Sequence, residues 1–278
     1  MKNRWNQWFT KGAQSELHAA YLHRLRTRNI GIRLTQISIL LVLLMSWELS
    51  TRLGWVDPFI FSSPSRIWDL FIHLTITGGL FRDIGITILE TTIGFLLGTI
   101  GGTALATLIW AYPFISRVLD PYLVVLNSMP KVALGPLLIV TIGAGFGSII
   151  AMGIAITIVI TTLVIHSSFQ SVDPHYINLA RSFGASRRQI FTSIIFPACI
   201  PDMIAALKVN VGLSWVGVVV GEFLVSKEGL GHLIIYGFQV FNLTLVLLSL
   251  VIVAFCATAM YQIVALLERH FLRHRHLD

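Results

Sequence analysis

Six apolar stretches, each about the length of a membrane span, restrict the fold of this chain more than any other feature. They lie at about 34–53, 84–110, 119–142, 148–166, 203–224 and 243–267. Most are apolar all round and lack the polar face that a helix on the surface of a soluble protein needs. Only 12% of the 278 residues are charged, against about 25% in soluble domains. The sequence therefore predicts an all-α, polytopic membrane bundle with six transmembrane helices.

The distribution of positive charge predicts the orientation of these spans. With both termini inside, 15 of the 20 Lys and Arg residues fall on the inner side and four on the outer, with Lys131 left within a span. Cytoplasmic segments retain Lys and Arg, so we expect both the N-terminus and the C-terminus to be cytoplasmic. The expected parts are a basic tail over 1–33, a membrane domain over 34–267 and a basic tail over 268–278.

Each basic tail could also be interpreted as a binding site. A basic arm beside a span is usually a topology signal, so no nucleic-acid partner is expected. His274 and His276 alternate with arginines in the C-terminal tail, where a solvated basic segment is favoured over a metal site.

Two local patterns concern packing. On the outer side, Ser63 and Pro64 suit a helix start, and the apolar residues after them follow helical spacing: Ile67, Leu70, Phe71 and Leu74. Within the second span, glycines recur in a pattern that favours close helix contact: Gly94, Gly98, Gly101 and Gly102.

The cytoplasmic loop over 167–202 carries the most local signal. Asp173 is a good N-cap with Pro174 at the first helical position, so a helix over 174–183 is predicted. Gly184 can adopt the left-handed turn that ends it. Ser186 and Gln189 fit a capping box for a second helix.

This second helix is predicted to bury one apolar face and to stop near Pro197; the apolar residues are Ile190, Phe191, Ile194 and Ile195. An ordinary connector between spans is the alternative interpretation. A simple connector does not readily explain why the chain forms a compact helix–glycine–helix unit, since a few residues would be enough to join two spans.

The order Ala180, Gly184-Ala185, Ile190-Phe191, Ile194 and Pro197 resembles the EAA loop of binding-protein-dependent ABC importer permeases. The usual Glu-Ala-Ala reads Asn178-Leu179-Ala180 here, so the acid is absent. Further segments are similar to the nitrate/sulfonate/taurine branch of that family: Pro64–Arg66, Thr87–Gly102, Pro130–Leu137 with Gly143, Gly221–Leu224, Glu228–Gly231 and Leu267–Arg269.

This resemblance implies a type I importer (MetI-like) permease fold in the cell membrane of a prokaryote. It implies that the loop docks on a separate ATPase subunit, which binds the ATP, so that this chain needs no cofactor. The residues that would carry the docking are Asn178, Leu179, Ala180, Phe183, Gly184, Ala185 and Pro197. It also implies an extracytoplasmic substrate-binding protein, a second copy of the permease, and a small, anionic solute such as a sulfonate, nitrate or taurine.

Polar residues inside the spans are candidates for the translocation path, because such groups tend to face a cavity or a partner. The candidates are Lys131, Asn127, Asn210, Ser214 and Glu222. Lys131 either attracts an anion in the path, pairs with a carboxylate such as Glu90, or lies less deeply than its span suggests. Glu222 either lines the outer gate, contacts the binding protein, or is a solvated helix-end acid. Glu48 is expected at the outer interface.

Two other functions compete with an importer permease. A secondary transporter usually shows an internal repeat with broken helices at matching positions, and the sequence shows none. An intramembrane enzyme needs a catalytic constellation, and neither a nucleotide-binding loop nor a hydrolase motif occurs. We therefore expect a transport subunit rather than an enzyme.

Overall fold

The computed structural model describes residues 16–273, and all elements within this range are helices. The chain forms two compact units, 1–68 and 69–278, each described separately below. The predictions for the first tail cations and for His274 and His276 fall outside the described residues.

The first unit joins a long helix to the start of a short one. Helix α2 (Glu16–Arg52) begins well before the predicted span at 34, and after it come α3 (Pro58–Phe61) and the first turns of α4 (Pro64–Thr77). The Ser63 hydroxyl accepts a hydrogen bond from the Arg66 N–H at 3.3 Å, which confirms the predicted cap.

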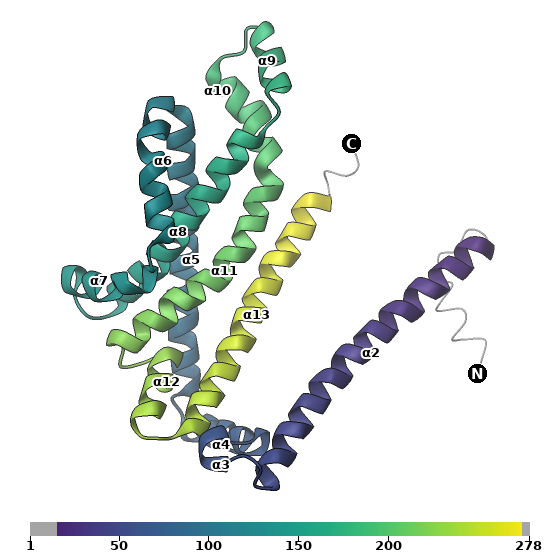
Figure 1. Ribbon diagram of the computed structural model, residues 1–278, viewed down its shortest axis with the longest axis vertical. Coiled ribbons are helices and arrows are strands. Elements are labelled where there is room, and N and C mark those ends of the chain that lie inside the picture. The colour runs from purple at the N-terminus through teal and green to yellow at the C-terminus, as the bar shows by residue number, and fades with distance from the viewer. Residues whose placement is uncertain (1–15, 274–278) are drawn as a thin grey trace. The chain divides into compact units, whose positions relative to one another are not determined.

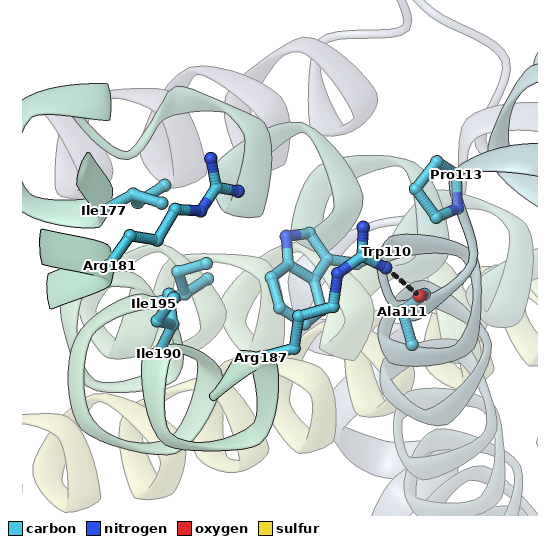
Figure 2. Close-up of a pocket in the computed structure, with 8 residues that line it drawn as sticks. All are labelled: Trp110, Ala111, Pro113, Ile177, Arg181, Arg187, Ile190 and Ile195. Atoms are coloured by element: carbon cyan, nitrogen blue, oxygen red, sulfur yellow. Dashed lines mark hydrogen bonds between the residues drawn. The ribbon is translucent and has the colours of Figure 1, made fainter. Parts of the chain in front are cut away.

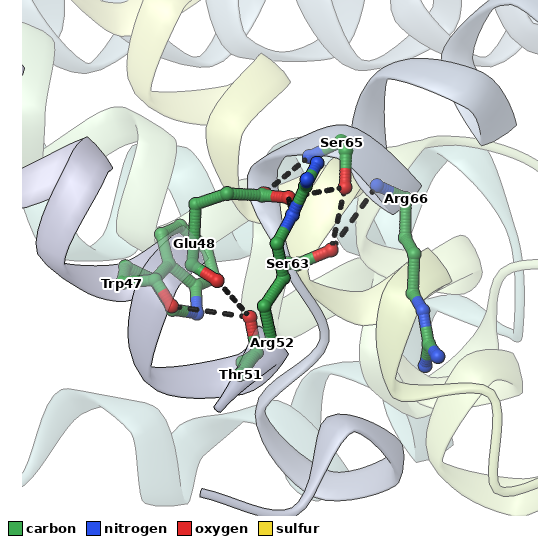
Figure 3. Close-up of polar contacts among 7 residues, drawn as sticks. All are labelled: Trp47, Glu48, Thr51, Arg52, Ser63, Ser65 and Arg66. Carbon is green, nitrogen blue, oxygen red and sulfur yellow. Dashed lines mark hydrogen bonds and ion pairs between the residues drawn. The ribbon is translucent and has the colours of Figure 1, made fainter. Parts of the chain in front are cut away.

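The Glu48 carboxylate also holds the start of α4. It accepts hydrogen bonds from the Ser65 N–H at 3.1 Å and the Ser65 hydroxyl at 2.9 Å, and it pairs with Arg52 at 2.6 Å (Figure 3). Four orphan N–H groups begin any helix, and a carboxylate near them is stabilising. Glu48 therefore holds the first turn of α4 at the end of α2.

The second unit is built on three long helices that pack against one another: α5 (Leu80–Ala111), α8 (Phe146–Ser171) and α11 (Phe196–Val225). Helix α13 (Leu243–Arg273) lies beside α11, and the short α12 (Leu230–Gln239) joins them at one end (Figure 1). At the opposite end lie α9 (Pro174–Ser182) and α10 (Arg187–Ile190).

Glycines bring the three long helices into backbone contact. A Cβ added to Gly217 would lie 2.8 Å from the Gly153 Cα, and one added to Gly94 would lie 3.4 Å from the same atom. A Cβ on Gly98 or Gly102 would overlap Thr157 or Thr161. The close packing predicted for the glycines of the second span is confirmed.

The span predicted over 119–142 is bent in the structure. Helix α6 (Pro113–Ser128) ends before Pro130, and the chain continues as a 3-10 turn (Lys131–Leu134) and α7 (Gly135–Ile142). The two arms, Pro121–Ser128 and Lys131–Ile142, meet at 91°. The residue before a proline avoids helical geometry, and Met129 is extended with ψ 136°. The described residues thus hold five helices long and apolar enough to span a membrane, or six with this bent pair as one span.

The prediction that the second loop helix stops near Pro197 is also wrong. It continues through a π-helical segment, Phe191–Ile195, into α11. Pro197 has no N–H, and in a regular α-helix its ring would clash with the carbonyl four residues earlier. The wider π turn directly before it accommodates the ring, so that the helix continues.

Candidate functional site

The loop between α8 and α11 has the predicted form of two capped helices around a glycine turn. The Asp173 carboxylate accepts a hydrogen bond from the His175 N–H at 2.8 Å at the start of α9. Gly184 has φ +78°, and its N–H donates to the Arg181 carbonyl at 2.9 Å. The Ala185 N–H donates to the Ala180 carbonyl at 3.0 Å, which completes a Schellman motif.

The second helix of the loop starts with the predicted capping box. The Ser186 N–H donates to the Gln189 side-chain oxygen at 2.8 Å, and the Gln189 N–H donates to the Ser186 hydroxyl at 3.4 Å. Both helix ends at the turn are thus closed by hydrogen bonds from residues of the loop itself.

The loop presents an apolar outer face. Leu179 and Phe183 are exposed, Phe183 at 84% of its surface, while Ala180 and Ala185 pack against a buried cluster that includes Ile190. Beside Phe183 is a hollow of about 310 Å³ with the following lining: Ala180, Phe183, Gly184, Ala185, Gln189, Ser193 and Ile194. Asn178 is exposed on α9, and Pro197 lies in the first turn of α11. Of the seven predicted docking residues, four therefore line this hollow, Asn178 and Leu179 lie exposed on α9, and Pro197 lies farther along the chain.

Two of the predicted path residues hold the long helices together. The Asn210 side-chain amide of α11 donates to the hydroxyls of Thr161 on α8 at 2.6 Å and Thr99 on α5 at 3.0 Å. The Ser214 hydroxyl donates to the Thr91 carbonyl of α5 at 2.9 Å. Asn210 and Ser214 are fully buried, so in this conformation their hydrogen bonds go to neighbouring helices. Their place in a translocation path stays a prediction.

A third path candidate, Glu222, is buried completely, which excludes the solvated alternative. Its carboxylate accepts a hydrogen bond from the Thr87 hydroxyl at 2.6 Å and another from the Gly231 N–H. The Leu230 N–H donates to the Thr87 oxygen at 2.8 Å, and the Gly229 N–H donates to the Asp83 carboxylate at 2.7 Å. Side chains of α5 and α11 thus satisfy three successive N–H groups at the start of α12.

Glu90 belongs to the same buried group. Its side chain is buried, with 1% of its surface exposed. Among the described residues no ion pair joins Glu90 to Lys131, whose ammonium group donates to the Asn127 carbonyl, so the alternative in which the two pair is wrong.

Lys131 lies at the bend after α6 instead. Its ammonium group donates to the Asn127 carbonyl at 2.9 Å, one of the last carbonyls of α6. Cations are favourable at helix C-termini for this reason. The two candidates from this part of the chain, Asn127 and Lys131, thus contact each other at the bend.

Sequence reasoning missed Asp83, Thr87 and Thr161 as partners of these groups. Asp83, Thr87 and Thr91 follow one another at intervals of four, and Gly94 and Gly98 continue near the same helix face. This polar and small stripe on an otherwise apolar span was the available signal. The interhelical Lys208–Glu268 ion pair, at 2.5 Å between α11 and α13, had no such local signal.

Long apolar helices, glycine-mediated contacts and a capped loop between spans define a helical membrane protein of the importer-permease type. Residues 94–273 match the family model of the binding-protein-dependent transport system inner membrane component, and the chain belongs to this family. It is thus a transport permease subunit of an ABC importer.

Curated relatives support this assignment over most of the chain. A probable ABC transporter permease of Haemophilus influenzae is 33% identical over 77% of this chain and 88% of its own length. The putative aliphatic sulfonates transport permease SsuC of Bacillus subtilis is 29% identical over 84% of this chain and 85% of its own length. The riboflavin transport system permease RibX of Chloroflexus aurantiacus is 28% identical over 91% and 92%.

Solved structures confirm the fold. An inward-facing MetNI methionine ABC transporter has a TM-score of 0.53 at 18% identity, over 67% of this chain and 94% of that chain. An amino acid ABC transporter has a TM-score of 0.57 at 17% identity, over 73% and 96%. The MetI-like fold predicted from the sequence is therefore confirmed.

Proposed function

We propose that this permease imports a small anionic solute, such as a sulfonate, which an extracytoplasmic binding protein delivers and a separate ATPase subunit drives. The loop α9–Gly184–α10 is the ATPase contact, both termini are cytoplasmic, and two copies of the chain form the pore. The exposed Leu179–Phe183 face beside a preformed hollow carries this proposal. An apolar side chain exposed this fully at the end of a membrane bundle favours a partner surface.

The absent acid at Asn178 changes how such a contact would be made. An exposed amide supplies hydrogen bonds but no charge. Docking would then depend on the shape of the hollow and on Phe183 rather than on an ion pair from this position. Salt should weaken the complex little, since apolar contact is not screened.

The anionic substrate class has two supports. Lys131 is the cation left within the predicted third span, and two relatives are named for aliphatic sulfonates. Other relatives are named for riboflavin and formylaminopyrimidine, so the substrate class needs its own test. Measuring which solutes the partner binding protein retains, with sulfonates, nitrate and riboflavin as the panel, decides this point.

One pair of cysteine substitutions tests docking and orientation together. Phe183 follows α9, and Phe241 lies between α12 and α13 at the opposite end of the second unit (Figure 1), so Phe183→Cys and Phe241→Cys place exposed thiols at the two ends. A thiol cross-linker should join the Phe183→Cys chain, but not the Phe241→Cys chain, to the ATPase. A membrane-impermeant thiol reagent added to intact cells should label Phe241→Cys alone. The unsubstituted chain reports the background from Cys199 and Cys256.

A further inference from the structure

A cavity of about 170 Å³ lies under the loop, between it and the junction of α5 with α6. Trp110 and Pro113 contribute from that junction, Ile177 and Ile190 from the loop, and Arg181 and Arg187 extend over the cavity (Figure 2). A single water molecule needs a cavity of only about 15 Å³, so this cavity can hold a larger group.

The charge of the cavity is uncompensated. Its lining includes two arginines and no acidic residue. The Arg187 guanidinium donates to the Ala111 carbonyl at 3.4 Å, which uses one of its five N–H groups. Among the residues that the structure describes, none forms an ion pair with the Arg181 guanidinium. Figure 2 likewise draws no hydrogen bond from Arg181 to the other residues that line the cavity. Several donors thus remain available to an anion.

The cavity lies at the end of an apolar helix. Ala111 is the last residue of Leu80–Ala111, a helix long and apolar enough to cross a membrane. Trp110 directly before it is a residue type enriched at the level of the lipid headgroups. The walls combine isoleucine and tryptophan with guanidinium groups, which fits an amphiphile better than a fully hydrated ion.

We propose that this cavity binds the phosphate of an anionic phospholipid from the inner leaflet. This inference rests on the cytoplasmic placement of the loop in the proposed function. Arg181 and Arg187 contact the phosphate, since guanidinium groups bind phosphate oxygens through paired hydrogen bonds. The glycerol end of the lipid lies against Trp110. Basic pockets between helices on the cytoplasmic side take such headgroups.

Bound in this way, the lipid adds a contact between the loop and the end of α5, which already pack against one buried cluster. Arg181 belongs to α9 and Trp110 to α5, so a headgroup between them ties the loop to the membrane-spanning core. In this way a lipid of the inner leaflet would help to fix the position of the loop that contacts the ATPase.

Native mass spectrometry of the purified, delipidated permease tests the proposal with phosphatidylglycerol and phosphatidylcholine as probes. Arg187→Gln and Arg188→Gln are a matched pair: the two arginines are neighbours and lose the same charge, but only Arg187 lines the cavity. We expect retained phosphatidylglycerol to fall about fivefold more in Arg187→Gln than in Arg188→Gln, the factor that one cation contributes near an anionic surface. Phosphatidylcholine retention should be equal in both.

Three results would overturn the proposal. The first is equal loss of phosphatidylglycerol in the two variants. The second is displacement of phosphatidylglycerol by inorganic phosphate at equal concentration, which would identify a free-anion site. The third is unchanged lipid retention in Arg187→Gln with loss of the ATPase on co-purification, which would assign both arginines to the partner protein. Failure of the proposed orientation would appear in the thiol-labelling experiment and not in this one.

Discussion

The Thr87 hydroxyl of α5 donates to the Glu222 carboxylate of α11 at 2.6 Å and at the same time accepts from the Leu230 N–H of α12. One hydroxyl therefore joins three helices at one end of the second unit. Thr87→Val removes both hydrogen bonds while keeping the shape of the side chain. Each buried group left unpaired costs about 1–3 kcal/mol, so the variant should unfold at a clearly lower temperature in detergent.

The control for Thr87→Val is Thr107→Val on the same helix. The Thr107 hydroxyl bonds only to the Thr103 carbonyl of its own helix, at 2.8 Å. Its loss should change the unfolding temperature little. If the two substitutions lower the unfolding temperature equally, the hydrogen bonds of Thr87 to α11 and α12 add no stability beyond that of a bond within one helix.

Gly217→Ala should destabilise the bundle, because the added methyl group would lie 2.8 Å from the Gly153 Cα and 3.0 Å from the Met152 carbonyl oxygen. Both obstacles are backbone atoms, so α8 and α11 must separate, and overpacking of this kind costs about 1–3 kcal/mol. Gly212→Ala on the same helix meets nothing within 4 Å and serves as the matched control. Thermal unfolding in detergent compares them, and an unfolding temperature of Gly217→Ala at or above that of Gly212→Ala would contradict the close backbone contact.

Gly184→Pro should abolish uptake while the protein still inserts into the membrane. Proline holds φ near −65° and has no N–H, whereas Gly184 has φ +78° and donates to the Arg181 carbonyl. Gly184→Asn is the control, because asparagine tolerates the left-handed region and should keep most of the transport. Membrane yield, ATPase co-purification and uptake are measured together. Normal uptake by Gly184→Pro would show that the turn is not needed for coupling.

Lys131→Ala should lower uptake of an anionic substrate more than it lowers expression. The ammonium group caps the end of α6 and supplies positive charge at the bend, and alanine removes both. Lys131→Arg keeps the charge and should retain most of the uptake. If Lys131→Ala and the unsubstituted chain take up the substrate equally, Lys131 has no part in the path.

Lys208→Met and Glu268→Gln test the ion pair between α11 and α13. Its side chains are about three-quarters buried or more, with 25% and 20% exposed. Each single substitution leaves the partner charge without its counterion, so the double variant should be more stable than the two single losses predict together. Coupling between contacting residues of this kind is about 0.5–3 kcal/mol. Strictly additive unfolding free energies would show that the pair has no energetic coupling.

Features that depend on interactions between residues close in the sequence were predicted correctly. The caps at Asp173 and Ser186 and the turn at Gly184 were predictable, since each depends on residues within a few positions. Helical spacing likewise predicted the glycine contacts of α5. These features need no knowledge of the neighbouring helices.

The features that the sequence did not predict arise from prolines and from long-range contacts. A hydropathy pattern does not distinguish a straight span from the 91° bend at Pro130. The π segment before Pro197 depends on how a single ring is accommodated within a helix. The burial of Glu222 depends on Thr87, 135 positions earlier in the chain, which no local pattern reveals.

The π segment has a mechanical consequence. Because it lets the chain pass Pro197 without a break, Arg187–Val225 is one continuous helix of 39 residues, about 58 Å long. This helix begins at the start of α10. Near its other end lies Glu222, whose carboxylate accepts a hydrogen bond from the Gly231 N–H of α12. The helix that begins in the loop therefore also carries Asn210, Ser214 and Glu222, so that the loop and the far end of the bundle belong to one continuous element.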